Sequence, residues 1–449
     1  MKHTKSILMA AAAALSIASA SAQTVIYITG ATAFRSAANN TLYSLYSNNL
    51  YATSATNANN SGALALYFTN CPLTNGQRAD IAVTWTGSEG GMRSVASGTN
   101  NIQVPFYDFT KISNGASANA FSTASPPYLQ VTTPNTTDMV AGTYTTMAKG
   151  MIGFSDSFQS SSRFMNGPRA GDGRRYVALN MQQVGVVPYS WVASRGWTNN
   201  FPDRNITYFN AFQALEVGET AGSSYSGRTN DSTIKIFTVG RNIDSGTRVI
   251  TLANLRYGVT RDVKQFQCFQ SGGTITNMTW WPVRSINGIT TGLGGGGENS
   301  GGVVGDYMTN VITSSTLITT ETPDDIITPG NTNYLIGYVS VADISSARRN
   351  AGLTPLKYNG VEGRCHDSST FTALDAGYTN IISGSYPFWG YEFVSFDNSS
   401  ATANVRSLAN DLVTRIKSFP STSSIIAPNI NLNDMRVRRT LDGGILLPR

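Results

Sequence analysis

The chain has 449 residues, of which 41% are hydrophobic and only 13% are charged, and 32 Lys and Arg against 26 Asp and Glu give a formal net charge of +6. This mild basic balance contains no run of Lys or Arg, so the composition does not favour nucleic-acid binding. The hydrophobic content suffices for a sizeable core, and the length favours two domains or lobes.

Residues 1–22 have the features of an export signal. Lys2, His3 and Lys5 form a basic start, residues 7–18 are apolar, and Ala20-Ser21-Ala22 fits a cleavage site of small residues. No later segment approaches the roughly 18 to 20 apolar residues that a membrane span needs. We therefore expect a mature protein that begins at Gln23, lies in the periplasm or outside the cell, and does not insert into the membrane.

The cysteines and histidines limit the chemistry of this chain. Cys71, Cys268 and Cys365 lack the spacing of metal ligands. One disulfide and one free thiol can form from them in an oxidising compartment, and the sequence leaves the pairing open. His366 is the only histidine after the export signal, which disfavours a Ser-His-Asp triad and an all-histidine metal site. We expect no metal, no cofactor and no catalysis.

Short β-like runs alternate with stretches of helical hydrophobic spacing, which predicts an α/β architecture. The expected strands are Val25–Thr29, Asp80–Trp85 and Ile234–Val239. The expected helices are Phe34–Tyr46, one starting at Met92–Val95, Val249–Leu255 and Val405–Ile416, the last with the clearest amphipathic pattern. The glycine-rich run Gly292–Gly297 is expected in a loop.

Four short segments have the composition of strand-to-helix junctions rich in Gly, Ser and Thr. They are Thr29–Arg35, Thr86–Gly91, Gly153–Ser157 and Arg241–Thr247. A helix that starts after a strand leaves backbone N–H groups unpaired and carries partial positive charge at that end. Small hydroxyl residues and glycine allow an oxyanion to approach these groups. The four segments together predict one anion-binding site.

The fourth junction is the most specific. Arg241 offers a planar fork to two oxygens of a tetrahedral oxyanion. Ser245 and Thr247 supply hydroxyls, and the N–H groups of Gly246 and Thr247 point toward the same space. The alternative is an ordinary capped helix, with Asp244 or Ser245 as the N-cap.

The other junctions also have structural alternatives. Thr32 stands where a helix cap is needed, and Ser88 before Gly90-Gly91 also suits a plain tight turn. Asp156 is a carboxylate among anion-binding groups, which fits a ligand that carries a proton and donates it in a hydrogen bond. Its alternative is a surface or capping aspartate.

The order of these segments resembles that of the phosphate-binding proteins of bacterial ABC transporters, a branch of the type II periplasmic binding proteins. Each motif of this chain is similar to one of that family, in the same order. The motifs are Gly30–Phe34, Gly87–Arg93, Gly153–Asp156, Arg241–Thr247, Gly292–Gly295 and Ile336–Val339. The family has an acidic residue two positions after its arginine, where this chain has Ile243 followed by Asp244.

The resemblance implies a two-lobed type II periplasmic-binding-protein fold with the ligand cleft between the lobes. One lobe would contain residues 23–184 and 384–449 and the other residues 185–383, with closure by hinge motion. It also implies phosphate or a related oxyanion as the ligand and an ABC permease as a partner, and we expect a monomer. The residues that would contact the anion are Thr32, Phe34 (through its N–H), Ser88, Asp156, Arg241, Ser245, Gly246 and Thr247.

Two other functions stay open at this point. An extracellular structural or adhesive protein could keep the fold without binding a ligand, since long Asn-, Ser- and Thr-rich loops and 10% aromatic residues suit surface contacts. A secreted phosphatase-like hydrolase would use Ser88 or Ser245 as its nucleophile, against the shortage of histidine.

Overall fold

The computed structural model describes residues 24–49, 51–54, 62–114, 128–130, 144–167, 171–286, 288–319, 327, 329, 332–365 and 375–449. The expected export signal and His366 lie outside these residues. Among the described residues, no helix combines the length and the apolar character that crossing a lipid bilayer requires.

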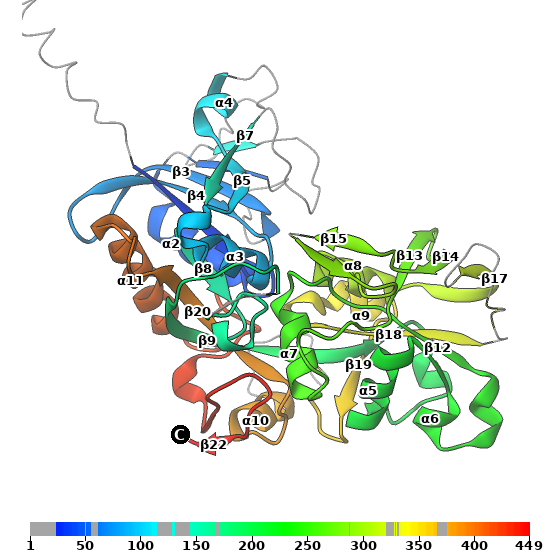
Figure 1. Ribbon diagram of the computed structural model, residues 1–449. Helices are drawn as coiled ribbons and strands as arrows, with labels where there is room; N and C mark the ends of the chain where they lie inside the picture. The colour runs from blue at the N-terminus through cyan, green and yellow to red at the C-terminus, as the bar shows by residue number, and fades with distance from the viewer. Residues whose placement is uncertain are drawn as a thin grey trace, which may run out of the picture.

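The first lobe is built on parallel strands of one large sheet (Figure 1). Strand β1 pairs in parallel with β4 on one side and β8 on the other. The strands of this lobe are β1 (Val25–Gly30), β2 (Tyr51–Thr53), β3 (Ala65–Pro72), β4 (Arg78–Thr84), β5 (Gln103–Tyr107), β6 (Tyr128–Gln130), β7 (Thr145–Lys149) and β8 (Ile152–Ser155). Its helices are α2 (Arg35–Tyr46), α3 (Ser88–Val95), α4 (Phe109–Asn114) and α11 (Ala403–Ser418).

The second lobe continues the same sheet and adds a small three-stranded sheet, β13-β14-β17. The strands of this lobe are β10 (Asn205–Ile206), β11 (Glu219–Ala221), β12 (Lys235–Thr238), β13 (Phe266–Ser271), β14 (Thr274–Trp280), β15 (Arg284–Ile286), β16 (Ile289–Thr291), β17 (Val311–Thr319), β18 (Asn333–Ser340) and β19 (Thr354–Tyr358). Its helices are α5 (Tyr208–Val217), α6 (Ser223–Ser226), α7 (Gly246–Asn254), α8 (Gly301–Tyr307) and α9 (Ser346–Asn350).

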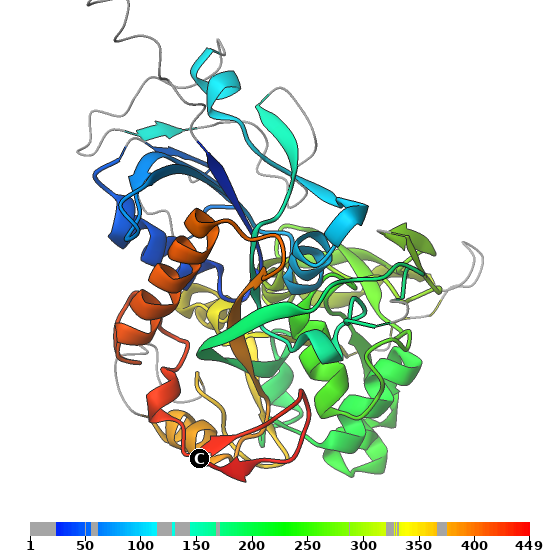
Figure 2. The ribbon, with the colours of Figure 1, turned by 60° about the vertical axis from the view of Figure 1, so that its left-hand side comes forward.

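Two long strands join the lobes, as Figures 1 and 2 show. Strand β9 (Leu179–Ala193) pairs with β20 (Trp389–Asp397) along its length and with β18 and β19 at its end. Strand β20 also pairs with β8, so the sheet runs without interruption in the order β11-β12-β18-β9-β20-β8-β1-β4-β3-β2-β6. Helix α10 (Ala376–Ser383) precedes β20, and the short β21 (Val437–Arg438) and β22 (Leu447–Pro448) lie near the C-terminus. The expected α/β architecture with two lobes is confirmed.

The hydrophobic spacing explains how the helices cover the sheet. The apolar face of α11, with buried Leu408, Leu412 and Ile416, packs against α2, β9 and β20. Strands β1, β4 and β12 and helices α2, α7 and α11 match the sequence expectations to within three residues at either end. The Gly292–Gly297 run lies outside helices and strands, as expected.

Two local expectations are wrong. Helix α3 begins at Ser88 rather than near Met92. Gly90 and Gly91 are therefore helical, and a Cβ on Gly91 would lie 2.5 Å from the Cα of Gly30, so close packing on β1 favours glycine within this helix. The predicted α-helix after β8 does not form, because this strand is followed by a 3-10 turn at Gln159–Ser161. No disulfide joins Cys71, Cys268 and Cys365, all of which are buried, so the disulfide that the sequence left open is absent.

Candidate functional site

Three helices start at the region where the two lobes meet. Helices α2 and α3 follow β1 and β4, whose carboxyl ends lie at the same edge of the sheet because the two strands are parallel. Phe34 and Gly87 are the N-caps of these helices, and neither helix has a side-chain cap. Helix α7 starts from the second lobe, with Ser245 as its N-cap. Uncapped helix starts leave N–H donors available to an anion.

The starts of α3 and α7 are in direct contact across the lobes. The N–H of Glu89 donates to the carbonyl oxygen of Asp244 at 3.0 Å. Gly87 has a positive φ of 85°, and a Cβ at this position would overlap the same carbonyl. Glycine is therefore required here both by the backbone conformation and by the close approach of the second lobe.

Asp156 lies at this contact and is almost completely buried. The hydroxyl of Ser88 donates to Asp156 Oδ1, and the N–H of Asp156 donates to Ser88 Oγ at 3.3 Å. A Cβ on Gly246 would lie 2.5 Å from Ser88 Oγ and closer still to Asp156 Oδ1. Ser88 and Asp156 from the first lobe thus pack directly on the first residue of α7.

Arg241 is buried and reaches the first lobe. Its Nε donates to the carbonyl oxygen of Glu298 at 3.1 Å, and its Nη2 donates to that of Asn299 at 2.8 Å and to Thr32 Oγ1 at 3.0 Å. Its Nη1 has no hydrogen-bond partner among the residues that the structure describes, and Arg241 forms no salt bridge within this set. A buried guanidinium with an unused N–H group is an incomplete arrangement, because buried polar groups are normally hydrogen-bonded.

The electrostatics of the site are set by burial. Burial lowers the pKa of the Arg241 guanidinium, and the negative charges of Asp343 and Asp156 oppose this change. Burial raises the pKa of Asp156, while the hydrogen bond from Ser88 and the charge of Arg241 lower it in part. The aspartate therefore holds a proton more readily than an exposed carboxyl, and it can share one with a ligand.

Two further buried carboxyls interact with Asp156. Glu392 of β20 is fully buried, and neither of its carboxyl oxygens has a hydrogen-bond partner among the described residues. Burial, together with the charge of Asp156, raises the pKa of Glu392 well above its usual value. Burial likewise raises the pKa of Asp442 to about 7, although the Phe158 N–H donates to its carboxyl at 2.8 Å. The site is therefore bordered by acids that favour the protonated form.

The remaining candidate residues have mainly structural contacts. Ser245 accepts a hydrogen bond from the N–H of Arg248 at 3.4 Å, so it is the helix cap that the alternative interpretation allowed. Thr247 is buried in the first turn of α7. Thr32 does not cap α2 but accepts from Arg241, and the ring of Phe34 stacks on Phe154 with the centroids 6.3 Å apart.

Sequence reasoning missed a second buried arginine, Arg248. Its Nη1 donates to the carbonyl oxygens of Arg241, Gly295 and Gly296 at 3.1, 2.7 and 3.2 Å. A Cβ on Gly297 would overlap the Arg241 carbonyl. The glycine-rich run thus lies against the backbone of the Arg241 segment, and its composition was the only signal of this role.

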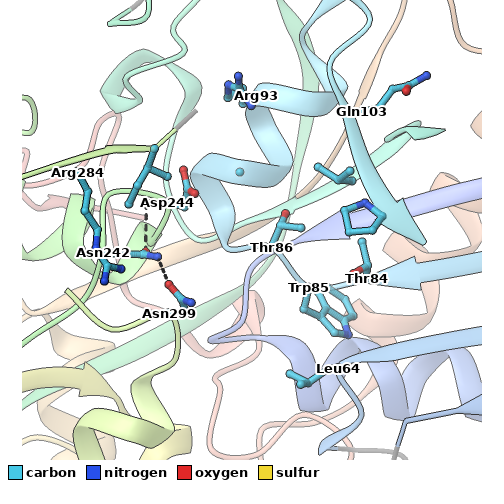
Figure 3. A pocket seen from close by; sticks show the side chains of 14 residues that line it. Leu64, Thr84, Trp85, Thr86, Arg93, Gln103, Asn242, Asp244, Arg284 and Asn299 are labelled. Carbon is cyan, nitrogen blue, oxygen red and sulfur yellow. Dashed lines mark hydrogen bonds between the residues drawn. The ribbon is translucent and has the colours of Figure 1, made fainter. Parts of the chain in front are cut away.

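A cavity of about 340 Å³ opens beside the site, between the lobes (Figure 3). We call it the outer pocket. The first lobe contributes Thr84, Trp85 and Thr86 among others, and the second lobe contributes residues of the Arg241 segment, β15 and Asn299. In Figure 3, Arg284, Asn242 and Asn299 lie on the side opposite Trp85 and Thr86, and Asn242 Nδ2 donates to Asn299 Oδ1 at 2.5 Å.

Comparison with known proteins gives matches only among solved structures, since no family model and no curated protein matches the chain. A protein from Clostridium perfringens described as a phosphate ABC transporter substrate-binding protein, solved with bound phosphate, shares 12% identity at a TM-score of 0.41 over 91% of this chain and 99% of its own. An ABC-type phosphate transport receptor from Vibrio cholerae shares 10% identity at a TM-score of 0.41, and the match covers 90% of this chain and 99% of the receptor. A proposed phosphate-binding protein from Planctomyces limnophilus shares 9% identity at a TM-score of 0.38, and the match covers 91% of this chain and 93% of that protein. These are proteins of the kind that the sequence motifs resemble. The resemblance is one of fold.

Proposed function

We propose that this is an exported, monomeric solute-binding protein that captures inorganic phosphate or a similar tetrahedral oxyanion without catalysis and delivers it to an ABC permease. The single observation that supports this proposal most is the position of Arg241. Its buried Nη1 lacks a partner among the described residues, and Thr32, next to the uncapped start of α2, contacts the same guanidinium.

The charges of the site suit a protonated oxyanion. Arg241 supplies the positive charge, and the starts of α2 and α3 supply N–H donors and partial positive charge. In its ionised form, Asp156 would accept a hydrogen bond from the P–OH group of phosphate and would repel an anion without a proton, such as sulfate. Charge-assisted hydrogen bonds contribute about 1.5–3 kcal/mol each, so three to five of them would correspond to micromolar affinity at about −8 kcal/mol.

Ligand entry requires that the lobes move apart. Gly246 packs directly on Asp156 and Ser88, and Arg241 is bonded to Thr32 across the lobes. An anion can reach Arg241 only after these contacts separate, which is the expected motion of a two-lobed binding protein. The strands β9 and β20 connect the lobes and would carry this motion.

Calorimetric titration of the protein starting at Gln23 with phosphate and with sulfate tests the proposal. We expect phosphate to bind with micromolar or tighter affinity and sulfate to bind much more weakly. The absence of both heat and a thermal shift with phosphate would contradict the proposal.

One observation favours a second candidate, an extracellular structural or adhesive protein that keeps the fold without a ligand. The residues of the site already bond to one another, Thr32 with Arg241 and Ser88 with Asp156, and this could replace a ligand permanently. A protein that binds no phosphate but retains its cooperative unfolding transition would support this candidate.

A further inference from the structure

The outer pocket is much larger than a compact ion such as phosphate requires. Its volume of about 340 Å³ lies within the range of cavities that hold small organic ligands. Both lobes line it, so its shape is complete only when the lobes are together. The protein therefore has room between its lobes for more than an oxyanion.

The outer pocket adjoins the proposed anion site. The carbonyl oxygen of Asn299 accepts from Arg241 Nη2 at 2.8 Å, while Asn299 also lines the pocket. On the opposite side, Thr86 lines the pocket, and its hydroxyl bonds to that of Thr29 at 2.8 Å, at the end of β1. Asn299 thus borders both the proposed anion site and the outer pocket, and both belong to the interlobe region that must open for the anion to enter.

The lining favours a hydroxylated group. Asn242, Asn299, Thr86 and Asp244 present amide, hydroxyl and carboxylate groups, which would lose hydrogen bonds to water without replacement if an apolar group filled the pocket. The indole N–H of Trp85 already donates to Asn39 Oδ1 at 3.0 Å, so this side chain can offer the pocket only apolar surface. Amides and hydroxyls beside a flat apolar surface suit a polyol or a sugar.

The charge of the pocket is compatible with a phosphorylated ligand. Arg284 is exposed, forms no salt bridge with the described residues, and lies over Trp281 with its guanidinium 5.2 Å from the ring centroid. The Nε of Arg93 lies 3.8 Å from Oδ2 of Asp172 in a salt bridge. This Nε has no hydrogen-bond partner among the described residues. With Arg93 paired to Asp172, Arg284 offsets the carboxylate of Asp244, so the lining of the pocket does not repel an anionic ligand.

We infer that the ligand is a phosphate monoester of a short polyol or a sugar, with its phosphate group at Arg241 and its hydroxyl groups in the outer pocket. This inference rests on the proposed function, because it needs the oxyanion site at Arg241. It adds that the organic part of the ligand provides affinity that free phosphate lacks.

Calorimetry with four probes tests the inference: inorganic phosphate, glycerol 3-phosphate, glucose 6-phosphate and glucose. We expect at least one of the two esters to bind about tenfold or more tightly than phosphate, and glucose alone not to bind. Asn299→Ala removes the amide but keeps the backbone carbonyl that contacts Arg241. This variant should lose most of the tenfold preference for the ester over inorganic phosphate. Arg438→Ala, at an exposed arginine away from the pocket, is the matched control and should change neither affinity.

The outcomes separate the two proposals. Phosphate binding with equal or weaker binding of both esters would overturn the inference and leave the proposed function standing. Binding of none of the phosphorylated probes would overturn both. A fifth probe, pyrophosphate, tests whether Arg93 and Arg284, the arginines that line the outer pocket, bind a second anionic group. If pyrophosphate binds more tightly than either ester and Arg284→Ala removes that preference, the outer pocket takes a second anionic group and the polyol assignment is wrong.

Discussion

Substitution of Gly246 by alanine tests directly whether the contact between the lobes is the closed state of a binding protein. Gly246 does not have a positive φ and begins α7, so alanine can adopt its backbone conformation. The added methyl group, however, would lie 2.5 Å from Ser88 Oγ and closer to Asp156 Oδ1, both in the other lobe. The substitution therefore affects the contact between the lobes far more than the fold of either lobe.

The expected size of the effect follows from this overlap. An ordinary contact of the new carbon begins at 3.4 Å, so the start of α7 must move away from Ser88 by about 1 Å or more. Inserting one carbon into a tightly packed contact costs about 1–3 kcal/mol. If phosphate binds only when the lobes are together, its affinity should fall by about 5- to 150-fold, because each 1.4 kcal/mol corresponds to a factor of ten.

Calorimetry measures the affinity, and small-angle X-ray scattering with and without phosphate measures the closure. We expect Gly246→Ala to bind more weakly and to have a larger radius of gyration than the parent at the same phosphate concentration. Gly62→Ala is the control, since a Cβ at Gly62 meets no atom within 4 Å. If Gly246→Ala binds phosphate within twofold of the parent and scatters identically, the interlobe contact is not part of the binding site.

The remaining predictions concern charge. Arg241→Ala should weaken phosphate binding at least a hundredfold, because loss of one partner of a buried charged contact costs about 3 kcal/mol or more. Equal phosphate affinities of this variant and the parent protein would contradict the proposed site. Asp156→Asn should preserve phosphate binding within about tenfold but strengthen sulfate binding, and competition titrations should show this loss of discrimination. Burial raises the pKa of Asp442 from 3.8 to about 7, so the folded state binds more protons than the unfolded state between these values. The free energy of unfolding should therefore decrease as the pH rises through this window. Urea denaturation at pH 5 and pH 8 should show a smaller decrease for Asp442→Asn, whereas the exposed Asp203→Asn should behave like the parent.

The sequence predicted the elements whose signals are local. Helix α11 has an uninterrupted apolar stripe, and β1 is a short apolar strand followed by a helical pattern, so periodicity sufficed for both. The start of α3 was misplaced because Gly90 and Gly91 have poor helix propensity, which the close packing of Gly91 on Gly30 and of Gly90 on Thr86 overrides. No local signal distinguished the 3-10 turn after β8 from a helix.

The candidate site was predictable only in part, because only some of its residues have a local signal in the sequence. Each junction carries its own composition, which allowed Arg241, Ser88 and Asp156 to be named from sequence. Arg248 and Glu392 gave no such signal, because their roles depend on segments distant in the chain, namely the Gly292–Gly297 run and the strand β20 beside Asp156. The outer pocket depends on the packing of one lobe against the other, which no sequence pattern encodes.

The uninterrupted sheet has a mechanical consequence. Strand β9 is hydrogen-bonded to partners in both halves of the molecule, and one hydrophobic core includes residues as far apart as Ile26 and Tyr338. The proposed opening and closing would therefore twist a continuous β-sheet elastically instead of rotating two independent bodies about a flexible hinge. The amplitude of motion is limited by the stiffness of that sheet, and the two halves are expected to melt together in a single calorimetric transition.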